Sequence, residues 1–181
     1  PETLKALRAH ARNNRITTSL IGQGYYVTFT PGVIKRNVLE NPSWYTAYTP
    51  YQPEIAQGTL QTLFEFQSQV ARLFGVDVAN ASMYDGSTAC WEAITMARRI
   101  TKRSKAILSS GLHPHYVSVA KTMAKFTKDN LSYEAPRLEA GTDGQSLLDQ
   151  IDDDTSCVVV QYPDILGRID DMSELAARAK K

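Results

Sequence analysis

The sequence predicts an α/β fold with a mostly parallel sheet, preceded by a helical and loop segment at the amino terminus. Short apolar runs alternate with amphipathic helical patterns from residue 58 onward, which is the order expected of right-handed strand–helix–strand crossovers. One run, residues 157–160, is continuously apolar, as is typical of a parallel strand covered on both faces.

The amino-terminal segment is predicted to contain two helices and an aromatic loop. Apolar residues at helical spacing indicate a helix over residues 2–12. Thr30 followed by Pro31 is a cap residue followed by a first-turn proline, which predicts a short helix that ends near Asn41. Residues 42–53 carry three prolines and three tyrosines with no helical or strand period, so we expect an ordered loop there.

The rest of the chain begins with an amphipathic helical pattern from Gly58. One face, which we expect to be buried, carries Leu63, Phe66, Val70 and Leu73, and Gly75 is placed to end the helix in the left-handed conformation. Further patterns follow in alternation. They predict helices from Asp85, His113, Gln145 and Asp171, and strands at residues 106–109, 131–135 and 157–160. The helix from Asp85 is expected to turn Cys90, Ala93, Ile94 and Ala97 inward. The basic stretch at residues 98–105 is expected to be a solvated helix end followed by a loop.

The composition excludes several classes of function. Lysine and arginine total 20 against 19 acidic residues, so no overall field favours nucleic acid as a partner. No apolar run reaches the about 18 residues that a membrane span needs, and no signal peptide opens the chain. Cys90, Cys157 and the three histidines lack metal-ligand spacing, so we expect no metal site. A cytoplasmic location fits best.

The two ends of the sequence suggest a fragment of a longer polypeptide. The chain opens at Pro1 without methionine and stops at Lys181 inside a helical pattern. We expect two parts: an amino-terminal helical segment with the aromatic loop, residues 1–57, and an incomplete α/β large domain, residues 58–181.

The turn Gly86-Ser87-Thr88 and the residue His113 are the candidate ligand-binding residues, because both precede helices at the expected carboxyl edge of the sheet. Anions prefer helix N-termini, and two hydroxyls beside a glycine could donate to a phosphate. Helix capping by Asp85 or Ser87 explains the same turn, and the lysine of a P-loop is missing. His113 is likewise either a helix cap or a ring that faces a planar ligand. Spacing alone leaves these alternatives open.

Three motifs carry a resemblance to a known family. They are residues 44–54, WYTAYTPYQPE, residues 22–26, GQGYY, and residues 79–86, ANASMYDG. From residue 16 to its end, the chain resembles the amino-terminal region of the P-protein of the glycine cleavage system. The MYDG version of the last motif resembles the separate subunit 1 more than the fused, single-chain form.

The resemblance implies a pyridoxal-phosphate-dependent transferase type I fold, of which this chain would hold part of the large domain. It implies an enzyme that decarboxylates glycine and passes the aminomethyl group to the lipoyl arm of H-protein. The cofactor lysine is expected on subunit 2. Pyridoxal phosphate would then be held by the partner subunit, and this chain, inactive by itself, would complete the partner's active site.

The resemblance also implies roles for individual residues. The residues expected to line the active site belong to the aromatic loop: Tyr48, Tyr51 and Gln52. The residues expected to form a degenerate cofactor site are the phosphate turn and the ring-facing position: Gly86, Ser87, Thr88 and His113. No residue is assigned a catalytic role.

None of the nine lysines is predicted to form a Schiff base. Such a lysine needs a desolvated pocket that lowers its pKa, whereas these lie on polar helix faces or in charged loops. Two alternatives to the subunit 1 hypothesis remain open. One is a self-sufficient pyridoxal-phosphate aminotransferase or decarboxylase whose lysine lies beyond residue 181, and the other is a scaffold subunit that makes no contact with substrate.

Overall fold

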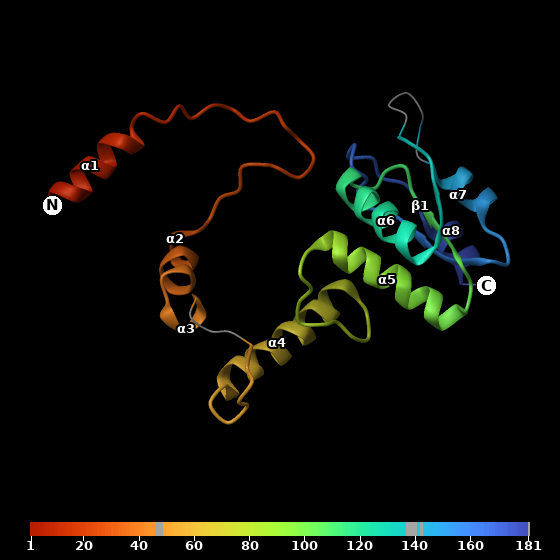
Figure 1. Cartoon of the computed structure of the whole chain (residues 1–181), viewed down its shortest axis with the longest axis horizontal. Coiled ribbons are helices and arrows are strands. Elements are labelled where there is room, and N and C mark those ends of the chain that lie inside the picture. The colour runs from red at the N-terminus through yellow and green to blue at the C-terminus, as the bar shows by residue number, and fades with distance from the viewer. Residues whose placement is uncertain (46–48, 137–140, 142, 181) are drawn as a thin grey trace. The chain divides into compact units, whose positions relative to one another are not determined.

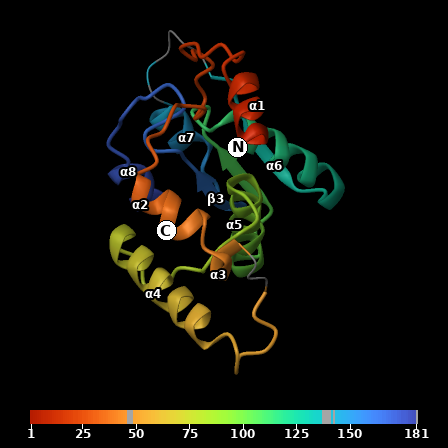
Figure 2. The ribbon, with the colours of Figure 1, turned by 90° about the vertical axis from the view of Figure 1, so that its left-hand side faces the viewer.

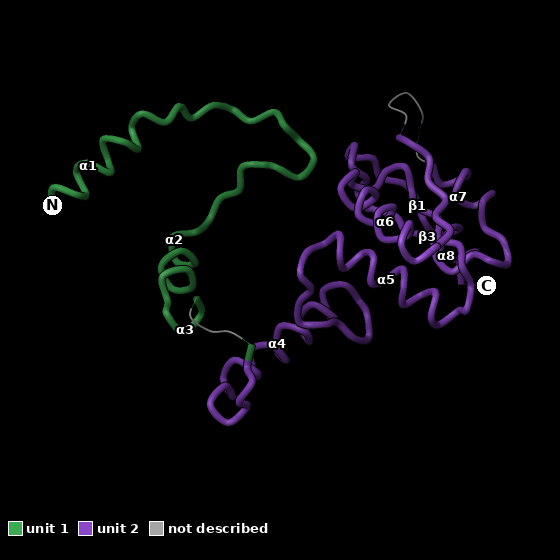
Figure 3. The backbone as a smooth tube through the Cα atoms, viewed as in Figure 1, with its two compact units in different colours: residues 1–49 green, residues 50–181 purple. Residues whose placement is uncertain are grey.

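The computed structural model describes residues 1–45, 49–136, 141 and 143–180, which fall into two compact units, residues 1–49 and residues 50–181 (Figure 3). The predicted division between residues 57 and 58 stays a prediction. Among the described residues, no helix has the length and apolar character that a membrane crossing requires.

Unit 1 contains the helices predicted for the amino-terminal segment. Helix α1, Glu2–Ala11, confirms the first of them. The second is the short helix α2, Gly32–Ile34, continued by a π-helical turn η1, Lys35–Leu39. Its N-cap is Pro31, one residue later than predicted, and no side chain caps it. The predicted loop also contains one helical turn, α3, Pro42–Tyr45.

Unit 2 begins with the amphipathic helix α4, Gln57–Phe74, which ends as predicted at Gly75 in the left-handed conformation, with φ 65°. The predicted burial of its apolar face is wrong: no described residue of α4 is fully buried, and Leu73 on that face is 80% exposed. Leu63 and Val70 are half-buried, but Phe66 is 50% exposed. Periodicity identifies the apolar face of a helix, but it does not determine whether another element of the chain covers that face.

The sheet of unit 2 has three parallel strands in the order β2-β1-β3. They are β1, Lys105–Leu108, β2, Asn130–Tyr133, and β3, Thr155–Val159. This arrangement confirms the predicted parallel sheet. The central strand β1 is the most buried, because helices cover both of its faces.

Helices cover both faces of the sheet (Figures 1 and 2). Helices α5, Gly86–Thr101, and α6, Pro114–Thr127, pack on one face around Ala106 and Leu108 of β1. Helices α7, Gly144–Gln150, and α8, Ser173–Ala179, pack on the other face around Ile107. Successive residues of β1 therefore serve opposite cores, as a strand's alternation requires.

Helix α5 shows where its predicted apolar face was incomplete. Ile94 is buried as predicted, at 1% exposure, but Ala93 is exposed. Trp91, which the pattern missed, is the other buried residue of the helix. The fully buried Asp129 carboxylate forms an ion pair with Arg98, so one arginine of the predicted solvated basic stretch joins the end of α5 to the turn before β2.

Candidate functional site

The candidate site lies at the carboxyl edge of the sheet, where the N-termini of α5 and α6 meet. Tyr116, in the first turn of α6, brings the predicted residues of the two helices together. A Cβ added to Gly86 would overlap the Tyr116 hydroxyl oxygen and lie 2.7 Å from its Cζ. The ring of Tyr116 also lies 5.5 Å, centroid to centroid, from that of His113. The sequence placed Gly86 and His113 at one edge but missed Tyr116 as their common contact.

The turn before α5 is a helix cap. The Thr88 backbone N–H donates to the Asp85 side chain at 2.7 Å, and Asp85 is the N-cap residue. Hydrogen bonds from Thr88 first, and from Ser87, hold the pKa of the Asp85 carboxyl below its usual value. Asp85 is therefore ionised at neutral pH, and its negative charge lies at the positive end of the helix dipole.

His113 is also a helix cap. Its Nδ1 accepts a hydrogen bond from the His115 backbone N–H at 3.2 Å, and it is the N-cap residue of α6. Its own backbone N–H donates to the Gln161 side chain at 2.9 Å, which joins the loop after β1 to the loop after β3. The capping alternative is thus the one seen for His113, and a role toward a planar ligand stays a prediction.

The loop after β1 is held by a carboxylate that the sequence analysis missed. Asp143 accepts from the Ser109 hydroxyl at 3.0 Å and from the Ser110 backbone N–H at 2.6 Å. The Ser109 hydroxyl oxygen in turn accepts from the Gly111 N–H at 3.0 Å. Asp143 comes just before α7, and no spacing rule pairs it with a serine 34 residues earlier.

A second missed carboxylate, Asp164, shapes the loop after β3. It accepts from the backbone N–H groups of Leu166 and Arg168 and from Nε of Arg168 at 2.6 Å. Gly111 packs so closely against it that an added Cβ would lie 2.7 Å from the Asp164 Cβ. Burial raises the pKa of Asp164, but the hydrogen bonds from Arg168 and Leu166 outweigh it and hold this pKa below its usual value.

The aromatic loop is described only in part. Tyr48 lies outside the described residues. Tyr51 is 78% exposed, and the backbone oxygen of Gln52 accepts from the Ile55 N–H at 3.3 Å in a turn before α4. The proposed place of these side chains in an active site stays a prediction.

The described lysines of unit 2 are not placed for Schiff-base chemistry. Lys105 alone among them is half-buried. Its Nζ donates to the Gln150 backbone oxygen at 2.5 Å and to Asp152 at 2.8 Å. These partners lie at the amino edge of the sheet, away from the candidate site.

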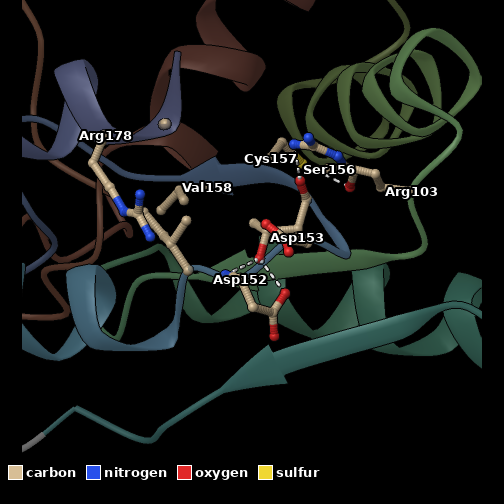
Figure 4. Close-up of a pocket in the computed structure, with 10 residues that line it drawn as sticks. Arg103, Asp152, Asp153, Ser156, Cys157, Val158 and Arg178 are labelled. Atoms are coloured by element: carbon tan, nitrogen blue, oxygen red, sulfur yellow. Dashed lines mark hydrogen bonds between the residues drawn. The ribbon is translucent and has the colours of Figure 1, made fainter. Parts of the chain in front are cut away.

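The pocket in Figure 4 lies at that same amino edge. Its lining includes Arg103, Arg178 and Asp152, with Cys157 and Val158 of β3. Several of its polar groups are already paired within the chain: Arg103 donates to the Thr155 oxygen, and Asp152 binds Lys105. We therefore assign it no ligand. No group of metal-ligating side chains occurs in the part of the chain that the structure describes.

The described residues at the carboxyl edge do not fit a bound pyridoxal phosphate. Tyr116 fills the space beside Gly86. The ionised Asp85 carboxylate already accepts the hydrogen bond from the Thr88 backbone N–H, which a phosphate would need. The assignment of this turn as a degenerate cofactor site stays a prediction.

A comparison with solved structures defines the class of protein. The crystal structure of glycine decarboxylase (P-protein) of the glycine cleavage system, in inhibitor-bound form, matches with a TM-score of 0.77 and 34% identity. The match covers 99% of this chain and 40% of that one. The predicted fold class is confirmed: the chain is part of a pyridoxal-phosphate-dependent transferase type I large domain.

The chain belongs to the glycine cleavage system P-protein family, whose model matches residues 1–181. Two relatives carry the name "Probable glycine dehydrogenase (decarboxylating) subunit 1". The one from Sphingopyxis alaskensis is 67% identical over 93% of this chain and 38% of the relative. The one from Erythrobacter litoralis is 55% identical over 97% of this chain and 39% of the relative. The chain thus spans less than half the length of these relatives. The family depends in general on pyridoxal phosphate.

Proposed function

We propose that this chain is part of subunit 1 of a P-protein that decarboxylates glycine and transfers the aminomethyl group to the lipoyl arm of H-protein. The observation that carries the proposal is the 67% identity to a protein named as subunit 1 of glycine dehydrogenase (decarboxylating). A subunit 1 implies a subunit 2, so the protein would act in a complex.

The contribution of this chain would be to complete an active site whose cofactor is held by subunit 2. Two features favour this division of labour. The half-buried Lys105 is paired at the amino edge of the sheet, and the turn before α5 is filled by Tyr116 and Asp85. The cofactor on subunit 2 would supply the electron sink for cleavage of the carbon–carbon bond.

The residues of this chain proposed to face the shared site are Tyr48, Tyr51 and Gln52. Tyr51 is 78% exposed, as expected of a residue at the surface of the chain. A tyrosine hydroxyl or a glutamine amide could donate to the glycine carboxylate or orient the lipoyl arm, as preorganised donors do. The cytoplasmic location also stays part of the proposal.

Reconstitution tests the proposal. Full-length subunit 1 with Tyr51→Phe or Gln52→Ala is mixed with unmodified subunit 2 and H-protein, and release of labelled carbon dioxide from glycine is measured. We expect each change to lower the rate at least about tenfold, equivalent to about 1.4 kcal/mol of transition-state stabilisation, with little change in melting temperature.

Tyr45→Phe is the matched control, because Tyr45 belongs to the same segment, is 63% exposed and is not assigned to the site. It should leave the rate unchanged. Decarboxylation by subunit 2 and H-protein at the full rate without subunit 1 would contradict the proposal and favour a scaffold role. Full activity of the Tyr51 and Gln52 variants in a complex that needs subunit 1 would refute only the residue assignment.

A further inference from the structure

Gly86 has no conformational reason to be glycine. It is the first residue of α5, and its backbone does not adopt the left-handed region that favours glycine. The close approach of Tyr116 requires a residue without a side chain at this position. A Cβ would overlap the hydroxyl oxygen, lie 2.7 Å from Cζ and lie 3.4 Å from Cε2, so the whole outer end of the ring would have to move.

Tyr116 is not free to move away without loss of contacts. It is half-buried, and its ring packs beside the His113 ring at 5.5 Å. It is separated by one helical turn from Ala120, which is 1% exposed in the core between α5 and α6. The contact between Gly86 and Tyr116 therefore joins the N-termini of the two helices at the carboxyl edge of the sheet.

The Thr88 backbone N–H, a donor of this turn, is also engaged. The Thr88 N–H donates to the Asp85 carboxylate, whose charge would repel a second anion at the same place. A phosphate bound at this turn would need both the space that Tyr116 occupies and a donor that Asp85 uses.

We propose that Tyr116 and Asp85 block anion binding at the N-terminus of α5. Glycine at position 86 then serves to accommodate the Tyr116 ring, and the turn does not bind phosphate. The turn then serves as a packing contact between α5 and α6. This assignment concerns the chain's own turn, and it stands or falls independently of whether the complex decarboxylates glycine.

A double-mutant cycle in full-length subunit 1 tests the contact between Gly86 and the Tyr116 ring. Gly86→Ala should lower the melting temperature by a few degrees when Tyr116 is present, because the ring is displaced. In a protein that also carries Tyr116→Ala, the same change should leave the melting temperature unchanged or raise it, since alanine is favoured over glycine in a helix. The sign of the Gly86→Ala effect should therefore depend on Tyr116.

Gly58→Ala is the matched control. Gly58 lies in the first turn of α4, and an added Cβ would meet no atom within 4 Å. Its effect should be the same in both backgrounds. If Tyr116→Ala prevents folding, Tyr116→Phe replaces it. The ring carbon at 2.7 Å remains, so Gly86→Ala should still lower the melting temperature in that background. Equal effects of Gly86→Ala with and without the Tyr116 ring would overturn the proposal.

A second measurement addresses phosphate directly. Inorganic phosphate and pyridoxal 5′-phosphate at low millimolar concentration should leave the melting temperature of subunit 1 unchanged, because a ligand stabilises only a protein that it binds. The low concentration avoids the general stabilisation that phosphate gives as a salt. A saturable rise that Gly86→Ala or Thr88→Ala abolishes would overturn the proposal.

Discussion

At the residue scale, the carboxyl edge of the sheet is held by acidic side chains that accept backbone N–H groups. Asp85 caps α5, Asp143 holds the loop after β1, and Asp164 holds the loop after β3. Each carboxylate satisfies donors that would otherwise face the edge without a partner from the helices or the sheet. The shape of the site therefore depends on acidic side chains that accept hydrogen bonds.

Asp164 supplies the first prediction at this scale. Asp164→Ala removes the acceptor of two backbone N–H groups and the partner of Arg168, so we expect it to cost about 1–3 kcal/mol of unfolding free energy. Asp164→Asn keeps one oxygen acceptor and should cost less. Urea unfolding of the three proteins at neutral pH measures both costs.

The pH dependence of this effect has a definite sign. The hydrogen bonds lower the pKa of Asp164 in the folded state below the usual value of 3.8. Its stabilisation is thus fully present above pH 3.8 and is lost as the pH falls through the lower folded-state pKa. The stability difference between the native chain and Asp164→Asn should shrink on acidification below pH 3.8. Asp153→Asn, at an exposed position, serves as the control substitution.

At the scale of elements, burial differs sharply between the helices of unit 2. Helix α4 has no fully buried residue among those described, whereas α5 buries Trp91 and Ile94 against β1. Both helices have an apolar face in the sequence. Only α5 packs on the sheet, beside α6, so its apolar residues contribute to the core of this chain.

This difference changes the stability prediction that the sequence alone suggested. Ile94→Ala should cost about 2–5 kcal/mol, as a large-to-small change at a site with 1% exposure. Phe66→Ala should cost clearly less, because Phe66 is 50% exposed, and not the about 3–5 kcal/mol expected of a buried phenylalanine.

Thermal or urea unfolding of the 181-residue chain compares the two variants. Glu65→Ala, on the exposed face of α4, should stay within about 0.5 kcal/mol and serves as the control. A larger cost for Phe66→Ala than for Ile94→Ala would show that α4 packs against another part of the chain.

At the scale of the whole molecule, the chain holds part of a large domain and spans 38–39% of two relatives of the same family. We predict that it forms no internal Schiff base with pyridoxal phosphate, since its described lysines lie on exposed surfaces or, for Lys105, in a pair with Asp152. Borohydride reduction in the presence of the cofactor, followed by peptide mass analysis, measures this. Stoichiometric labelling of any lysine would instead favour a self-sufficient enzyme.

The sequence by itself determined the features that depend on local chemistry and spacing. Single-residue preferences and short apolar patterns predicted the left-handed end of α4 at Gly75 and a cap at Asp85 or Ser87. They also predicted a strand near residues 157–160, which the structure places at Thr155–Val159. The family followed from three motifs, and the matching P-protein model confirms it. These properties need no knowledge of which segments meet in space.

Only the tertiary structure decided which of those segments make contact. The packing of Tyr116 against Gly86 joins residues 30 positions apart, and the Ser109–Asp143 hydrogen bond joins residues 34 positions apart. The exposure of Phe66 could not be predicted from the sequence either, because the helical period is the same whether or not another element covers that face. Periodicity and capping act within a few residues, whereas closure of the α5 turn and burial of a helix depend on packing between distant segments.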